Sequence, residues 1–144
     1  MRFWDTSAII PLISREPLSD DVRRLLEEDA EVVVWWATRV ECVSAISRRA
    51  REGSLDHEGE AAALDLLNDL SGSWAEVLPS ARLRERAEQT LVAHPLRAAD
   101  ALQLASALIW CGSRPRGRRF VSLDARLRTA ASRSGFVLLP DSIE

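Results

Sequence analysis

Strands and helices alternate along this chain, which predicts an α/β protein with a three-layer α/β/α sandwich around a parallel central sheet. Short β-branched or aromatic runs are separated by longer segments with helical spacing of apolar residues, and no tight hairpin turn joins two runs. Strands without hairpins between them run parallel, and parallel sheets are covered by helices on both faces. A length of 144 residues suits one such domain over residues 1–144.

The first part of the chain supplies two strands and two helices. Residues 2–5 are a short apolar strand, and the hydroxyl residues that follow, from residue 6, form a capped turn leading into a short helix. Residues 17–29 form a second helix with apolar residues at helical spacing. Residues 31–36 are β-branched and aromatic, so we expect the second strand there.

The middle of the chain continues the alternation. Residues 38–51 have one apolar helical face, and Gly53 ends that helix. Residues 56–70 form another amphipathic helix that a Ser-Gly-Ser turn ends, and residues 74–78 are expected to form the third strand. Ser80 is predicted to cap a helix that a His-Pro pair breaks.

The last part of the chain adds two helices and two strands. Residues 97–110, rich in alanine and leucine, have the strongest helical pattern in the chain. A basic loop over residues 112–117 leads to a strand over 119–123. Residues 124–134 are expected to form a helix, and residues 136–139 the closing strand.

The composition limits the class of protein. A net charge of −3 argues against binding nucleic acid through a general positive field, and all 19 basic residues are arginine. No apolar run approaches the roughly 20 residues that cross a bilayer, so we expect a cytoplasmic protein. Cys42 and Cys111 lack the spacing of a zinc site and are expected to be buried free thiols.

Four carboxylates stand where a predicted strand ends or a predicted helix begins: Asp5, Glu41, Asp100 and Asp124. The carboxyl ends of parallel strands, and the helices that start there, share one edge of the sheet, so we expect all four acids to meet. Acids gathered in this way raise each other's pKa unless a hard divalent cation such as Mg²⁺ takes up the charge. The pattern therefore predicts a metal site.

Each acid also has a local explanation that needs no metal. Glu41 fits a capping box, in which its side chain reaches back to the Thr38 backbone. Asp124 could be the N-cap residue of the helix that follows it. Asp100 could stabilise its helix as an acid in the first turn, where negative charge complements the helix dipole. Asp5 is the hardest to explain locally, because a carboxylate that ends an apolar strand is destabilising unless it has a use. The expected convergence of the four favours a site.

The candidate residues fall in four short segments, FWDTSA at 3–8, ECVSAI at 41–46, LRAADALQLA at 96–105 and FVSLD at 120–124. In the order and spacing of these segments, the chain resembles the PIN-domain ribonucleases, and in particular the VapC-type toxins of bacterial toxin–antitoxin pairs. The resemblance runs almost end to end, and it implies a PIN-like fold over the whole chain.

The resemblance implies that the four carboxylates are catalytic and bind one or two Mg²⁺ or Mn²⁺ ions. It implies that Ser7 supports the site, and Ser122 keeps a hydroxyl where the family commonly has threonine. Thr6 is expected to be structural. The resemblance further implies a metal-dependent endoribonuclease that hydrolyses RNA phosphodiester bonds to leave 5′-phosphates, a cognate antitoxin as partner, and a homodimer.

Arginines near the acids are the expected RNA contacts. Arg39, Arg97 and Arg126 each stand at the start of a helix that carries a candidate ligand, where they could bind RNA phosphates. A second basic cluster, within residues 114–119, precedes its strand and follows a long helix. We expect that cluster at the opposite edge of the sheet, about 20 Å from the acids.

The main alternative function is a PIN-like binding or scaffold domain without significant catalysis, and the presence of all four acids argues against it. Two other classes of protein also place acids at the ends of parallel strands. A response-regulator receiver needs a lysine, and a phosphatase of the haloacid dehalogenase type needs Asp-x-Asp after the first strand. The chain has neither feature.

Overall fold

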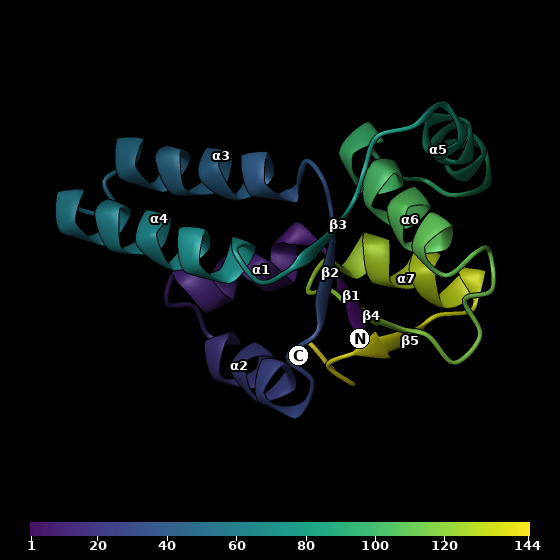
Figure 1. Ribbon diagram of the computed structural model, residues 1–144. Helices are drawn as coiled ribbons and strands as arrows, with labels where there is room; N and C mark the ends of the chain where they lie inside the picture. Colours follow the sequence, from purple (N-terminus) through teal and green to yellow (C-terminus); the bar gives the residue numbers. More distant parts are fainter.

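The computed structural model describes residues 1–144 and confirms the predicted three-layer α/β/α sandwich (Figure 1). The sheet has five parallel strands in the order β3-β2-β1-β4-β5. The strands are β1 (Arg2–Trp4), β2 (Val32–Trp35), β3 (Ala75–Val77), β4 (Arg119–Val121) and β5 (Val137–Leu139). The helices are α1 (Thr6–Ile13), α2 (Ser19–Glu28), α3 (Thr38–Arg51), α4 (His57–Ser71), α5 (Ala81–Ala93), α6 (Ala98–Trp110) and α7 (Ala125–Ser134).

Several elements are shorter than the sequence predicts, by one or two residues at an end. β1 stops at Trp4, and Asp5 becomes the N-cap residue of α1. β2 likewise stops at Trp35. α2 begins only at Ser19, whose buried hydroxyl accepts a hydrogen bond from the Glu16 N–H at 2.8 Å and so holds the preceding turn.

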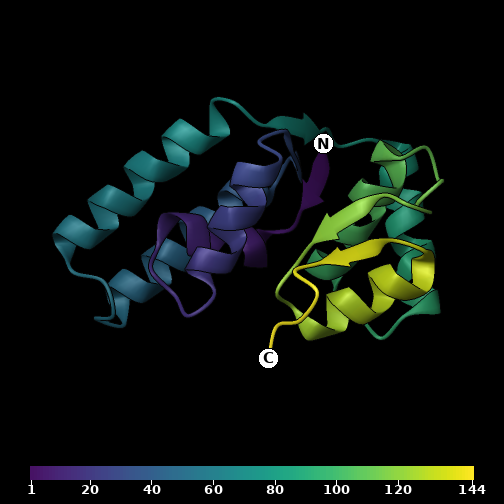
Figure 2. The ribbon, with the colours of Figure 1, turned by 90° about the horizontal axis from the view of Figure 1, so that it is seen from below.

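Alternate side chains of the strands point to opposite faces of the sheet and build two cores. Phe3, Val33 and Phe120 pack toward α5, α6 and α7, whereas Trp4 packs toward α1 to α4. Figure 2 shows α1 to α4 on one side of the sheet and α6 and α7 on the other. Phe3 and Trp4 both have 0% of their surface exposed, so the central strand β1 is enclosed from both faces and gives the site a rigid support.

The end of β1 lies beside the end of β4 at the edge of the sheet where the strands finish, here called the carboxyl edge. Trp4 pairs with Val121, and the Asp5 N–H continues this pairing by donating to the Val121 carbonyl at 3.1 Å. The turn that follows, residues 122–124, therefore leaves the sheet next to Asp5. Two segments more than 115 residues apart in sequence thus meet at one point.

Features outside the carboxyl edge also follow the sequence predictions. The basic loop precedes β4 and so lies at the opposite edge, where the Arg118 guanidinium carbon lies 5.3 Å from the Trp110 ring centroid. Cys42 and Cys111 are buried and unpaired. None of the helices combines the length and the apolar character that crossing a bilayer requires.

Candidate active site

Asp5 is the most deeply buried of the four candidate acids, with 4% of its surface exposed. The Ser7 hydroxyl, in the first turn of α1, donates a hydrogen bond to Asp5 Oδ1 at 2.8 Å. Burial raises the pKa of Asp5 to about 7, and the charge of Asp124 also raises it, while hydrogen bonds from Ser7 and Ser122 act in the opposite sense. Burial thus disfavours the ionised form of Asp5, although its charge also interacts with that of Arg128.

Two hydroxyl side chains join the Asp5 turn to the turn after β4. The Ser7 Oγ accepts a hydrogen bond from the Leu123 N–H at 2.8 Å, and the Ser122 Oγ accepts one from the Asp124 N–H at 3.2 Å. The two Oγ atoms lie 3.5 Å apart. These bonds fix the backbone of the β4–α7 turn against Asp5.

Asp124 both caps a helix and lies close to the other acids. Its Oδ1 accepts a hydrogen bond from the Leu127 N–H at 2.8 Å, so the local explanation of Asp124 as the N-cap of α7 is correct. Burial, and then the charge of Asp124, raises the pKa of Asp100 in the first turn of α6. Capping uses one carboxylate oxygen of Asp124 and leaves the other for a ligand.

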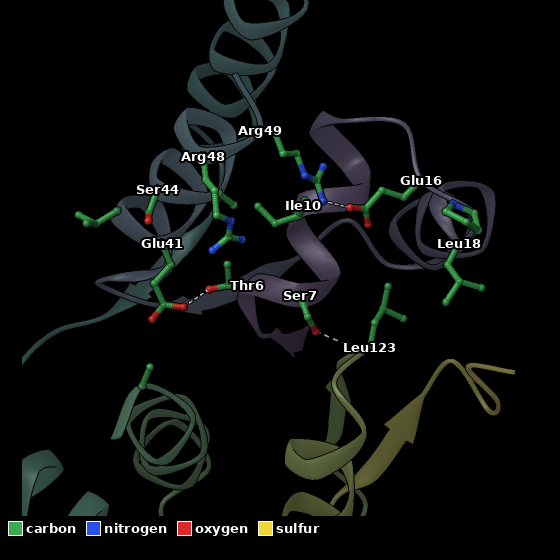
Figure 3. Close-up of a pocket in the computed structure, with 14 residues that line it drawn as sticks. Thr6, Ser7, Ile10, Glu16, Leu18, Glu41, Ser44, Arg48, Arg49 and Leu123 are labelled. Atoms are coloured by element: carbon green, nitrogen blue, oxygen red, sulfur yellow. Dashed lines mark hydrogen bonds and ion pairs between the residues drawn. The ribbon is translucent and has the colours of Figure 1, made fainter. Parts of the chain in front are cut away.

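Glu41 does not form the capping box that its spacing suggests. The N-cap residue of α3 is Ala37, which makes no side-chain cap, and Thr38 is buried as the first residue of the helix. Glu41 Oε2 instead accepts hydrogen bonds from the Thr6 hydroxyl at 2.6 Å and from Gln103 Nε2 at 3.2 Å (Figure 3 shows the first). Thr6, expected to be only structural, therefore holds a candidate ligand.

Gln103 is a residue that the sequence analysis missed. It is 2% exposed, and its Nε2 also lies 2.9 and 3.1 Å from the Thr6 and Thr38 hydroxyl oxygens, so its two N–H groups are shared among three acceptors. One feature of the sequence could have identified Gln103: it is a long polar side chain one helical turn after Asp100, in a segment otherwise made mostly of small and apolar residues.

The four acids form two groups in the structure. The charge of Asp124 raises the pKa of both Asp5 and Asp100, whereas Glu41 is held separately by Thr6 and Gln103. No three His, Cys, Asp or Glu side chains of the protein are close enough to share one metal ion. The carboxylate oxygens of Asp5 and Asp124 nevertheless fit Mg²⁺, because protein sites for this ion commonly use one or two carboxylates and several waters.

A groove of about 780 Å³ lies between α1, α3 and the turn before α2, and it reaches Thr6, Ser7 and Glu41. Figure 3 shows Arg48 projecting from α3 toward Thr6 and Glu41, while Arg49 pairs with Glu16. Arg48 makes no ion pair, unlike Arg49. Its position, two helical turns after Glu41, gives the groove a free positive charge that the sequence analysis also missed.

The three predicted phosphate contacts have different surroundings. Arg97 and Arg126 are exposed, and their charges lower the pKa of Asp100, against the effects of burial and of Asp124, so both arginines lie near the acids.

Arg39, the third predicted phosphate contact, is directed toward α4 and not toward the acids. Its guanidinium donates to Asn68 and Ser71 at the end of α4 and lines a separate hollow with Trp74. Arg39 and Glu41 are two residues apart in α3, so they point to nearly opposite sides of the helix. Arg39 therefore cannot face the acids together with Glu41.

Comparisons with solved structures agree with this architecture. VapC20 of Mycobacterium tuberculosis, a sarcin-ricin loop cleaving toxin, has 22% identity and a TM-score of 0.68, over 95% of this chain and 97% of that chain. PAE2754 from Pyrobaculum aerophilum has 20% identity and a TM-score of 0.67, over 96% of this chain and 88% of that chain. FitAcB from Neisseria gonorrhoeae has 15% identity and a TM-score of 0.66, over 96% of both chains. At these identities the similarity shows a common fold.

Comparison at the level of sequence gives the family. No curated protein matches the chain. The family model of the PIN domain, however, matches residues 2–132, which include all four candidate acids and every strand up to β4. The chain therefore belongs to the PIN domain family.

Proposed function

We propose that this protein is a Mg²⁺- or Mn²⁺-dependent endoribonuclease and the toxin of a toxin–antitoxin pair. The observation that carries the proposal is Asp5, a buried carboxylate with its pKa raised to about 7 at the carboxyl edge of the central strand, with Asp124 close by. Membership of the PIN domain family supports it, as does the fold shared with VapC20, a sarcin-ricin loop cleaving toxin.

The residues of the site have distinct roles in this proposal. Asp5 and Asp124 would hold the ion through carboxylate oxygens, Glu41 would bind it through water, and Asp100 would complete the acidic surroundings. When bound, a divalent cation supplies Lewis-acid assistance to the attack of water on a phosphodiester. Ser7 keeps Asp5 Oδ1 in a fixed direction by its hydrogen bond at 2.8 Å.

Substrate binding relies on arginine rather than on net charge. Arg97 and Arg126 bind RNA phosphates beside Asp100, because guanidinium groups form paired hydrogen bonds with phosphate oxygens. Arg48 extends the contact along the groove. A protein with net charge −3 would then bind RNA only where the metal and these arginines offset the acids.

The partners follow from the same proposal. An antitoxin that covers the groove would block the acids, and the apolar wall formed by Ile10, Leu18 and Val40 suits a protein segment. Trp36 and Leu78, which follow the neighbouring strands β2 and β3, are 49% and 63% exposed and are candidates for a homodimer contact. An RNA substrate and an antitoxin imply a cytoplasmic protein.

The test is cleavage of structured RNAs by the purified protein with Mg²⁺ or Mn²⁺, beside an Asp5→Asn variant and an EDTA control. We expect cleavage by the wild type only, with 5′-phosphate ends on the products. Equal cleavage by both proteins would mean that the nuclease is a contaminant. No cleavage by a folded wild type that binds RNA would favour the alternative, a binding or scaffold domain.

A further inference from the structure

Gln103 is a buried amide whose hydrogen bonds reach three other side chains at the candidate site. Its side chain is 2% exposed in the middle of α6. Its Nε2 lies 2.9 Å from Thr6 Oγ1, 3.1 Å from Thr38 Oγ1 and 3.2 Å from Glu41 Oε2. One amide nitrogen therefore joins α6 to α1 and to α3.

The orientation of this amide serves Glu41. Gln103 Oε1 is buried and has no hydrogen-bond donor. The amide could satisfy Oε1 by turning end for end, because the hydroxyls of Thr6 and Thr38 could then donate to it. That turn would set Oε1 against the Glu41 carboxylate, which only accepts hydrogen bonds when ionised. An unsatisfied buried oxygen is therefore tolerated so that the N–H groups face Glu41.

Thr6 adds a second link in the same direction. Its hydroxyl donates to Glu41 Oε2 at 2.6 Å and accepts from Gln103 Nε2, so Gln103 acts on Glu41 both directly and through Thr6. Hydrogen bonds in such a chain polarise and strengthen one another. Both links end on Oε2, which leaves Oε1 of Glu41 as the oxygen for a ligand.

We propose that Gln103 is a positioning residue, whose amide nitrogen fixes the Glu41 carboxylate for the divalent cation of the active site. The inference rests on the proposed metal-dependent function. Asp100 and Gln103 lie one helical turn apart on α6, so this helix presents one acid itself and orients another that lies 62 residues away in sequence.

The test compares two buried substitutions on the same helix. Gln103→Met keeps the length of the side chain and removes its N–H groups. Ser106→Ala is the matched control, because the Ser106 hydroxyl is buried but donates only to the Leu102 carbonyl of its own helix, at 2.7 Å. Mn²⁺ binding to the full chain is measured by electron paramagnetic resonance without RNA, followed by kcat and KM for RNA cleavage.

We expect Gln103→Met to weaken Mn²⁺ binding about 10- to 100-fold, as loss of a hydrogen bond in the surroundings of a metal site commonly does. It should lower kcat and leave KM for RNA unchanged, while Ser106→Ala matches the wild type. Thr6→Val, at a partly exposed position, should also weaken Mn²⁺ binding and tests the link if Gln103→Met does not fold. The double variant, Gln103→Met with Thr6→Val, should bind Mn²⁺ only slightly more weakly than the single variant with the lower affinity. Both side chains act through Glu41 Oε2, so their effects on Mn²⁺ affinity should not add.

Equal Mn²⁺ binding by Gln103→Met and Ser106→Ala would overturn the positioning role, and so would a wild type that binds no Mn²⁺. Failure of the proposed function gives a different result. A wild type that cleaves no RNA but binds Mn²⁺ in a manner that depends on Gln103 would refute the nuclease and uphold the positioning role.

Discussion

Replacing Asp5 with asparagine should make the metal-free protein more stable at neutral pH, although it removes the residue on which the proposed activity depends. Asparagine has nearly the same size, and its Oδ1 can still accept the Ser7 hydrogen bond. It carries no charge into the buried position, where Asp5 is 4% exposed. The variant therefore isolates the effect of burying the negative charge.

The magnitude follows from the pKa of Asp5, which burial raises from 3.8 to about 7. The native protein binds this proton more tightly than the unfolded chain, so the free energy of unfolding falls as the pH rises through this range. A tenfold difference in proton affinity corresponds to about 1.4 kcal/mol. The destabilisation by Asp5 is therefore absent below about pH 4, and above about pH 7 it is at most about 4 kcal/mol.

The assay is urea unfolding followed by tryptophan fluorescence in EDTA, between about pH 5 and about pH 8. The advantage of Asp5→Asn over the wild type should grow from about 1–2 to about 4 kcal/mol across this range. Asp65→Asn, at an exposed position of α4, is the control and should show no such trend. An Asp5→Asn protein that is less stable than the wild type at about pH 8, or a difference independent of pH, would refute the reasoning.

Three further predictions concern the hydrogen bonds, the core and the groove. Ser7→Ala removes the bonds to Asp5 and to the Leu123 N–H, so urea unfolding should show a loss of about 1–3 kcal/mol, and an unchanged midpoint would contradict this role. Phe120→Ala, at a position with 0% exposure, should lower the free energy of unfolding by about 3–5 kcal/mol by calorimetry, and a loss below about 1 kcal/mol would place it outside the core. In a cleavage-deficient background, Arg48→Ala should weaken RNA binding and reduce the slope of log K against log salt by about 0.7, whereas Arg114→Ala at the opposite edge should change neither.

The fold, and the edge of the sheet at which Asp5 lies, could be predicted because they depend on local patterns. Short buried strands alternate with amphipathic helices, and this alternation alone specifies a parallel sheet and the direction in which each strand ends. The position of Asp5 follows from this, since it comes directly after the central strand. That Asp124 caps α7 could also be predicted, because its partner, the Leu127 N–H, lies three residues away.

The surroundings of Glu41 could not be predicted because they depend on distant segments. The sequence around Thr38 is the same whether Glu41 caps its own helix or turns to other partners. Its actual donors, Thr6 and Gln103, lie 35 and 62 residues away, and only the packing of α1 and α6 against α3 brings them together. A local signature thus gave the wrong partner for a residue in a long-range network.

The arginines of α3 illustrate an error that helix geometry could have prevented. Two residues correspond to about 200° of rotation, so Arg39 faces away from Glu41 and toward α4. Seven residues correspond to about two full turns, so Arg48 returns to the face of Glu41 and enters the groove. Nearness in sequence favoured Arg39, whereas the helical period favours Arg48.

The most direct test of a metal site built on Asp5 is anomalous scattering from Mn²⁺ in crystals of the protein. We predict a peak within about 2–2.3 Å of an Asp5 carboxylate oxygen, with Asp124 as a second protein ligand and water in the remaining positions, one of these waters being held by Glu41. The peak should be absent from crystals of the Asp5→Asn variant. An ion bound only elsewhere, or one retained at the same position in the variant, would contradict the account.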